Sequence, residues 1–242
     1  MIAFAFLMAV ALPDTKAFDE VLKQHVTADG KVKYAKLHSG IAPLTKYVES
    51  LGAASPDSQP TLFPTKEAKL AYWINAYNAL VLHAFASEYP KDKNRLTGKL
   101  GQFQFFFRRK FKIGGIMRSL DDIESKSIRP LDNRIHFAIV CASTSCPWLS
   151  NEAFTEANVD KLLDSRARLF LNQESNVKVD VAKRTITVSK IFDWFQKDFV
   201  ASSKQLPAFI AKYRDKDGAT LSAGTWKVLF FEYDWSLNEK PD

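Results

Sequence analysis

The sequence predicts an α+β protein, in which a central helix packs against a small, mainly antiparallel sheet and further helices surround both. Residues 65–87 form a segment that is apolar nearly all round, as expected of a helix in the middle of a core. Residues 177–188 alternate apolar and polar side chains about a short turn, which is typical of a hairpin. With 46% hydrophobic and 13% aromatic residues, the 242-residue chain can bury a large core.

The N-terminus has the pattern of a secretory signal peptide. Residues 1–12 are apolar but too few to span a bilayer, and Thr15-Lys16-Ala17 would suit a cleavage site. No Lys or Arg precedes the apolar run, and the alternative is a buried N-terminal helix. We therefore expect a signal peptide at 1–17, a periplasmic or secreted location, and one α+β domain over 18–242 whose first part, 18–60, is helical.

The net charge is +7, and the Lys and Arg residues are scattered along the chain, without zinc-finger spacing or a long basic block. We therefore expect no nucleic-acid partner. Residues 103–113 mix aromatic and basic side chains and predict a strand pair with a basic rim, which Gly114-Gly115 would turn into a hairpin. The alternative is a surface that contacts an anionic polymer or a membrane.

The other elements follow from apolar spacing and capping residues. Thr65 can cap the central helix, Ser119 can cap a short helix through Glu124, and Thr155 can cap a helix that ends near Asn172. Further helices are predicted at 18–26, 41–51, 189–199 and 206–213, and a late strand at 226–234.

Two amides lie on the predicted central helix. Asn75 and Asn78 are three residues apart, so they share a face. Buried amides need hydrogen-bond partners. Either they brace neighbouring loops, or one lines a cleft and orients an imidazole or donates to an oxyanion.

The stretch 134–147 holds both cysteines and one of the four histidines. Residues 135–140 are apolar and β-rich and predict a buried strand, followed by a loop at 142–145. If Pro147 begins a short helix, Cys146 lies just before its N-terminus, where unpaired N–H groups lower a thiol pKa. His136 could then accept the thiol proton and return it to a leaving group.

The catalytic interpretation requires the strand to end near Cys141 and the loop to fold back. A strand rises about 3.3 Å per residue, and six extended residues can retrace the distance from His136. Glu124 is the candidate that orients His136, because a turn at Arg129-Pro130 could bring its helix beside the strand. Cys141 is expected to be a buried strand thiol, unless it forms a disulfide with Cys146 and silences that thiol.

Other residues complete the predicted site. Those expected to bind or orient a substrate are Asn75, Asn78, Ser145, Trp148 and Arg129. No metal and no cofactor is expected.

Several motifs together resemble one family, the domain of unknown function 547 (DUF547). They lie at 72–80, 119–124, 128–129, 136–137, 145–147, 151–154, 189–195, 198–199 and 233–238, so the resemblance covers most of 18–238. The stretch around His136 is in turn similar to papain-like and transglutaminase-like folds. That similarity implies acyl transfer at amide bonds by Cys, His and a carboxylate or amide. In those folds the thiol precedes the histidine, whereas here Cys146 follows His136.

Three hypotheses result. The first is a Cys146–His136–Glu124 thiol hydrolase or acyltransferase that acts on a peptide-like or protein substrate in the cell envelope. The second is a non-catalytic binding module that uses the same cleft and the basic-aromatic surface at 103–112. The third is a redox element in which Cys141 and Cys146 pair reversibly.

Overall fold

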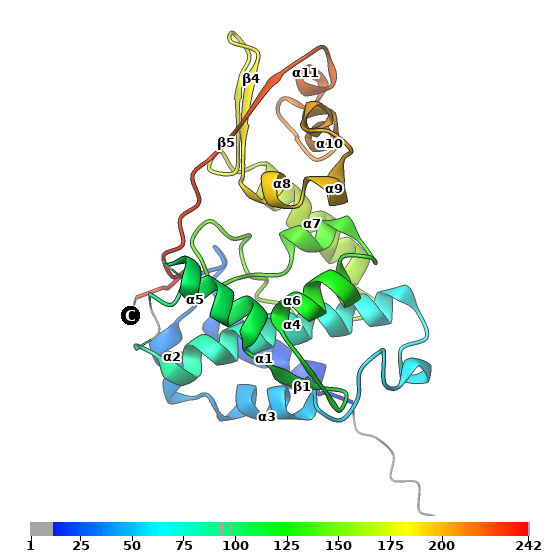
Figure 1. The fold of residues 1–242 in the computed structure, drawn as a ribbon, viewed down its shortest axis with the longest axis vertical. Helices are drawn as coiled ribbons and strands as arrows, with labels where there is room; N and C mark the ends of the chain where they lie inside the picture. The colour runs from blue at the N-terminus through cyan, green and yellow to red at the C-terminus, as the bar shows by residue number, and fades with distance from the viewer. Residues whose placement is uncertain (1–11, 92–93, 97, 242) are drawn as a thin grey trace, which may run out of the picture.

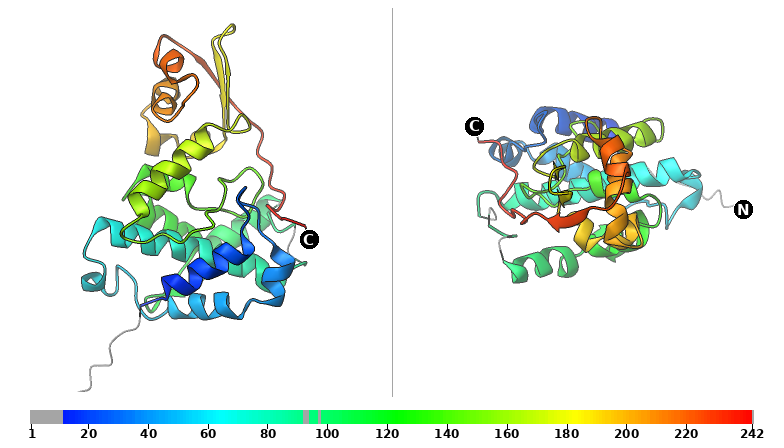
Figure 2. Two further views of the ribbon diagram at one scale, coloured as in Figure 1. Left: turned by 180° about the vertical axis from the view of Figure 1, so that it is seen from behind. Right: turned by 90° about the horizontal axis from the view of Figure 1, so that it is seen from above.

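The structure, a computed structural model, describes residues 12–91, 94–96 and 98–241. It has a helical body at one end and a smaller mixed part at the other, joined by helix α7 (Val159–Leu171). After the last strand the chain returns to the helical body as an extended segment, so its C-terminal end lies beside the N-terminal helices (Figures 1 and 2). The extended segment therefore spans both parts.

The helical body contains most of the N-terminal two thirds of the chain. Its elements are α1 (Thr15–His25), α2 (Tyr34–Ser39), α3 (Ala42–Ser50), η1 (Pro60–Leu62), α4 (Lys66–Glu88), α5 (Lys99–Phe103), η2 (Gln104–Arg108), β1 (Phe111–Ile113), β2 (Ile116–Arg118), α6 (Leu120–Asp122), η3 (Ile123–Ile128) and η4 (Asn133–Phe137). Here η1 and η4 are 3₁₀ turns, whereas η2 and η3 are π-helical.

The predicted signal peptide lies mostly outside the described residues, because residues 1–11 are not among them. The cleavage site expected at Thr15-Lys16-Ala17 forms the first turn of α1, where the Asp14 side chain accepts a hydrogen bond from the Ala17 amide (3.1 Å). Phe18, the next residue, is fully buried and stacks on Tyr47. The start of the described chain is thus packed into the helical body.

Helix α4 is the central helix that the sequence predicts. The Thr65 hydroxyl accepts a hydrogen bond from the Ala68 amide (3.0 Å), which caps the helix as expected. Its side chains are buried without interruption from Leu70 to Leu82, because α2, α3, α7 and η3 pack around it. The three-stranded sheet lies at the far end of the molecule (Figure 1). The sheet that contacts α4 is the antiparallel pair β1–β2, whose Arg118 guanidinium lies 5.6 Å from the centroid of the Trp73 ring.

The smaller part holds the predicted hairpin and short helices. Its elements are β3 (Val177–Asp180), β4 (Thr185–Val188), α8 (Ile191–Trp194), α9 (Gln196–Phe199), η5 (Ser203–Gln205), α10 (Leu206–Ala211), α11 (Gly218–Ser222) and β5 (Lys227–Phe230). Strands β3 and β4 are antiparallel, with Val177 opposite Val188, and β5 adds to β4 in parallel. A second sheet is the hairpin β1–β2 in the helical body. The α+β class is therefore confirmed.

Residues 103–108 are helical, and the strand expected there begins only at Phe111. A strand would point Phe103, Phe105 and Phe107 to the same side, whereas a helix turns Phe105 away from the other two. Because the segment is helical, Phe105 is buried against Phe85, whereas Phe103 and Phe107 are exposed. The hairpin turn at Gly114-Gly115 is as predicted, with both glycines at positive φ.

The strand predicted at 135–140 is wrong: residues 133–137 form the 3₁₀ turn η4, and the following residues are irregular. A strand would direct Ile135 and Phe137 to one face. In η4 these side chains instead enter two different hydrophobic clusters, Ile135 that of the helical body and Phe137 that of the smaller part. His136 therefore lies where the two clusters meet.

Candidate functional site

A cavity of about 750 Å³ lies between the two parts of the molecule. Its walls come from the helical body, from helix α8 and the residue after it, and from the returning C-terminal segment. Residues of these three sources include Tyr77, Phe106, Glu124, Ile191, Trp194, Phe195, Tyr233 and Trp235. A volume of this size suits a small organic molecule or a few residues of a peptide, and most of the lining is apolar.

His136 lines this cavity, and its ring is held by a hydrogen bond and by an aromatic contact. Its Nε2 lies 2.7 Å from Oδ2 of Asp198, and the ring stacks on Phe195 at 4.4 Å between centroids. Burial lowers the pKa of His136, and the hydrogen bond to Asp198 opposes that shift only in part. A neutral imidazole that donates Nε2–H to Asp198 keeps the lone pair of Nδ1, which can accept a proton.

Asp198 is held by a second partner. Arg129 donates to both carboxylate oxygens, from Nε to Oδ2 at 2.6 Å and from Nη2 to Oδ1 at 2.9 Å. Burial opposes ionisation, but the hydrogen bonds from His136 and Arg129 outweigh it and hold the pKa of Asp198 well below its usual value. Asp198 therefore stays ionised and fixes the orientation of the imidazole.

This arrangement corrects the role predicted for Glu124, since Asp198 and not Glu124 orients His136. Asp198 is 62 residues from His136 in the chain, so spacing alone could not pair them. The sequence contained one indication of Asp198: it lies in the motif at 198–199, to which the DUF547 resemblance assigned no role. Arg129, expected to contact substrate, instead binds Asp198 and lies over the Phe195 ring at 5.1 Å.

Glu124 lies in the same cavity with a perturbed carboxyl group. Burial raises its pKa to about 7, and the nearby charge of Arg129 limits the rise. The Tyr77 hydroxyl donates a hydrogen bond to Oε2 of Glu124 (3.3 Å). Glu124 is thus partly protonated near neutral pH and can serve as a proton donor.

Both cysteines line the cavity, and they are joined in a disulfide. Cys146 receives two hydrogen bonds at sulfur, from the Cys141 amide (2.9 Å) and from the Tyr233 hydroxyl (3.3 Å). The helix predicted to begin at Pro147 is absent from this described stretch, so no helix dipole acts on Cys146. In this oxidised state neither sulfur is a nucleophile.

The two central amides brace backbone, as one of the two interpretations predicts. Asn78 donates to the Ala138 carbonyl (2.9 Å) and accepts from the Val140 amide (3.0 Å). Asn75 holds the amide and carbonyl of Phe154 in the same way. Asn78 therefore fixes the segment between His136 and the disulfide, whereas Asn75 fixes a loop farther along the chain.

Two further predicted residues lie away from the cavity wall. The Ser145 hydroxyl accepts a hydrogen bond from the Asp234 amide (2.9 Å), which ties this loop to the C-terminal segment. Trp148 packs against Gly30, whose positive φ and lack of space exclude a side chain there. Neither is among the described residues that line the cavity.

Sequence reasoning missed an aromatic wall of the cavity. Trp194, Tyr233 and Trp235 contact one another with ring centroids 4.6–5.6 Å apart. They are brought together because the segment after β5 runs past helix α8 (Figure 1). Their only signal in the sequence was the presence of two tryptophans and a tyrosine in the terminal motifs.

Two features of other kinds of site are absent from the described residues. Within 12–91, 94–96 and 98–241, no group of three or more His, Cys, Asp or Glu could hold a metal ion. In the same ranges, no helix is both long enough and apolar enough to cross a membrane.

Comparison with known proteins gives one match. The family model described as "Protein of unknown function, DUF547" matches residues 62–171, a narrower stretch than the motifs suggested. The comparisons with curated proteins and with solved structures gave no significant match. The matched stretch runs from before α4 to the end of α7 and contains Glu124, Arg129, His136 and both cysteines. The DUF547 family that the motifs suggested is therefore confirmed over residues 62–171 of the chain.

Proposed function

We propose that the cavity is the active site of a thiol hydrolase or acyltransferase that acts on peptide-like amide bonds. One observation carries the proposal: His136, fixed by Asp198, lines the same cavity as the Cys146 sulfur and the Glu124 carboxyl. A base, a nucleophile and an acid with a pKa near 7 are the groups that amide cleavage needs.

The active form is the reduced one. A dithiol reductant supplies two electrons and two protons, which convert the Cys141–Cys146 disulfide into two thiols. We place the protein in the periplasm or outside the cell, where a disulfide is the stable resting form. A reducing partner protein would then activate it.

The reaction proceeds by acylation and deacylation. Nδ1 of His136 accepts the Cys146 proton, and the thiolate attacks the carbonyl carbon of the amide. As the C–N bond breaks, Glu124 donates its proton to the departing amine, and an acyl thioester remains on Cys146. Water, or the amine of an acceptor, then attacks the thioester. The Glu124 carboxylate removes a proton from the attacking group, and the proton held by His136 returns to the sulfur, so Cys146 leaves as the thiol and both groups regain their starting protonation.

Each supporting residue has a physical role in this scheme. Asp198 stabilises the imidazolium that forms when His136 accepts a proton, and Arg129 holds Asp198 in place. The apolar wall of Trp194, Tyr233 and Trp235 fits an apolar side chain of the substrate.

The test uses a library of dipeptide aminomethylcoumarin amides and four proteins. We expect wild type to cleave a library member only after a phosphine reductant opens the disulfide. Cys141→Ser, which leaves Cys146 as a thiol, should be active without reductant. Cys146→Ala and His136→Gln should each lower the rate at least about 10³-fold, as the loss of a nucleophile or base does. Full activity of Cys146→Ala would overturn the proposal.

A second measurement tests the activation of Cys146 without a substrate. In the Cys141→Ser background, mass spectrometry follows the alkylation of Cys146 by iodoacetamide against pH. If His136 activates the thiol, His136→Gln shifts the alkylation profile to higher pH. A profile that is the same with and without His136 contradicts the assigned base.

The disulfide itself favours a second candidate, a thiol redox element. Both sulfurs line the cavity, so a partner thiol could reach them there. The Cys141→Ser variant separates the two functions, because exchange of electrons through a disulfide needs both cysteines whereas amide cleavage needs one. A protein that reduces insulin disulfides only with both cysteines, and cleaves no amide, is a redox element.

A further inference from the structure

Exposed apolar side chains are concentrated in one short segment, residues 99–118. Of the ten large apolar side chains that are exposed among the described residues, five belong to it. They are Leu100 (69% exposed), Phe103 (46%), Phe107 (48%), Ile116 (50%) and Met117 (58%). The first three follow a helical spacing along α5 and η2, and the last two lie on β2 of the adjoining hairpin.

The same segment carries nearly all of the net charge. Between 99 and 118 there are six basic residues and no Asp or Glu, so the segment contributes +6 of the total +7 and the rest of the chain +1. Arg109, Lys110 and Arg118 pair with acids outside the segment. The other three, Lys99, Arg108 and Lys112, make no ion pair with a described residue.

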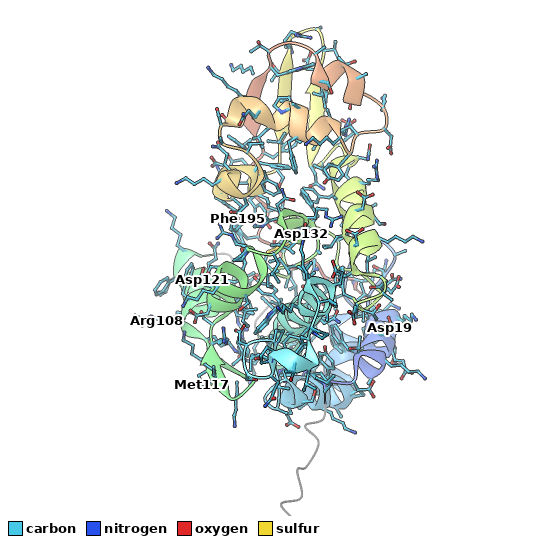
Figure 3. The ribbon with its side chains drawn as sticks, turned by 90° about the vertical axis from the view of Figure 1, so that its right-hand side faces the viewer. Asp19, Arg108, Met117, Asp121, Asp132 and Phe195 are labelled. Atoms are coloured by element: carbon cyan, nitrogen blue, oxygen red, sulfur yellow. A yellow bond between two sulfur atoms is a disulfide. The ribbon has the colours of Figure 1, made fainter. Side chains whose placement is uncertain are left out.

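These side chains lie on one side of the molecule. Figure 3 shows Arg108 and Met117 projecting from the same edge, and Figure 1 shows α5 and the β1 hairpin on the near face. Phe103 and Phe107 stack at 5.5 Å between centroids, and the Arg108 guanidinium lies 5.5 Å above the Phe103 ring. Apolar and basic groups are therefore interleaved on a single face.

We propose that residues 99–118 form a docking surface for an anionic lipid bilayer. Interfacial helices bind membranes with Phe and Leu in the acyl boundary and Lys and Arg at the headgroups, which is the composition found here. A nucleic acid would match the charge but would leave Leu100, Ile116 and Met117 without a role. A second copy is disfavoured because a two-fold contact would place two such basic surfaces against each other.

The docking surface is continuous with the wall of the cavity. Lys99, Phe106 and Phe107 belong to the segment and also line the cavity wall. A docked protein would thus open its cavity toward the bilayer. Resting on the proposed function, this identifies the substrate class as an amide carried by a membrane-anchored amphiphile, whose apolar chain follows the aromatic wall.

The experiment is co-sedimentation of the full chain with vesicles. We expect binding to phosphatidylcholine vesicles that contain 30 mol% phosphatidylglycerol, weak binding to pure phosphatidylcholine, and weaker binding at 0.5 M than at 0.1 M NaCl. The variant Leu100→Asp with Phe103→Asp should lose binding at least about ten-fold. Its matched control, Val181→Asp with Leu229→Asp, makes the same change in charge on exposed residues of the β3–β4 turn and of β5, and should bind like wild type.

A second pair of variants tests the charge. Arg108→Ala with Lys112→Ala should weaken binding at least about ten-fold, since each Lys or Arg at an anionic surface accounts for about five-fold. The control Lys204→Ala with Lys216→Ala, which removes two exposed cations of the smaller part, should not weaken binding. Cys146→Ala must sediment like wild type, so failure of docking is distinguishable from failure of the proposed chemistry. Vesicle binding that is equal in all variants, or retention by heparin without vesicle binding, overturns the proposal.

Discussion

Nε2 of His136 and Oδ2 of Asp198 lie 2.7 Å apart, although helix α7 and the β3–β4 hairpin separate them in the chain. The contact joins η4, between the two hydrophobic clusters, to helix α9 of the smaller part. Arg129 reaches the same carboxylate from just beyond η3. Packing between the two parts of the molecule therefore determines the electrostatic environment of the imidazole.

The first prediction concerns that environment. Asp198→Asn removes the negative charge that favours imidazolium and leaves the burial and the Arg129 charge that oppose it. The pKa of His136, already lowered by burial, should therefore fall further. Proton NMR titration of the four histidines, with His136→Gln to assign the resonance, measures the shift.

The control for this experiment is Asp193→Asn. Asp193 forms an exposed ion pair with Lys190 (2.7 Å) on helix α8 and does not touch the imidazole. Its loss should leave the His136 titration unchanged. An unchanged titration in Asp198→Asn as well would mean that Asp198 does not set the charge state of His136.

The second prediction follows from Glu124. Its pKa is about 7 in the folded protein and about 4.5 in an unfolded chain, so the folded state binds the proton more tightly between these values. The free energy of unfolding therefore falls as pH rises from 4.5 to 7, and this loss is complete above 7. The full shift would correspond to about 3 kcal/mol, and contact with the open cavity reduces it to about 2 kcal/mol.

Urea unfolding at pH 5 and pH 7.5 measures this effect. Glu124→Gln has no titrating group at this position, so its stability should fall less between the two pH values than that of wild type. Asp121→Asn, which removes another carboxylate that lines the cavity, serves as the control. If Glu124→Gln and wild type lose equal stability, Glu124 is ionised in the folded protein at pH 5.

The parts of the fold that sequence predicts are those in which local pattern and burial agree. Helix α4 is apolar all round because it is surrounded by other elements, and its cap at Thr65 is local. The predictions fail at 103–108 and 135–140, where apolar residues serve two different surroundings. A run of apolar residues does not say whether its side chains enter one core or two.

The site was predictable in its residue types and less so in its contacts. His136, Glu124 and Cys146 do line one cavity. The orienting carboxylate Asp198 and the wall residue Tyr233 come from the smaller part and the C-terminal segment, whose approach depends on the packing of α7 and β5. Such long-range contacts leave no periodic signal in the chain.

The third prediction concerns the disulfide. Cys141 and Cys146 close a loop of about six residues, for which the chain-entropy relation gives about 2 kcal/mol of stabilisation. Reduction should therefore lower the free energy of unfolding by about that amount, as measured by urea unfolding with and without a phosphine. Intact mass should rise by two hydrogens. The free energy of unfolding of Cys141→Ser should not change with the phosphine. If that of wild type does not change either, the disulfide does not stabilise the fold.

The fourth prediction distinguishes residues that stabilise the fold from residues that also position the cavity side chains. Asn75 and Asn78 are both about 2% exposed, and each satisfies one buried amide and one buried carbonyl. Replacing either by Ala leaves both backbone groups unpaired away from water, at a cost of about 2–4 kcal/mol. Urea unfolding should show a similar loss for the two variants.

The two variants should differ at the cavity. Asn78 holds Ala138 and Val140, which lie between His136 and Cys141, whereas Asn75 holds Phe154. In the Cys141→Ser background, Asn78→Ala should therefore alter the pH profile of Cys146 alkylation, and Asn75→Ala should not. Because both variants lose similar stability, a difference between their profiles reports the position of the His136–Cys146 segment and not general loosening. Identical profiles would assign Asn78 to the fold alone.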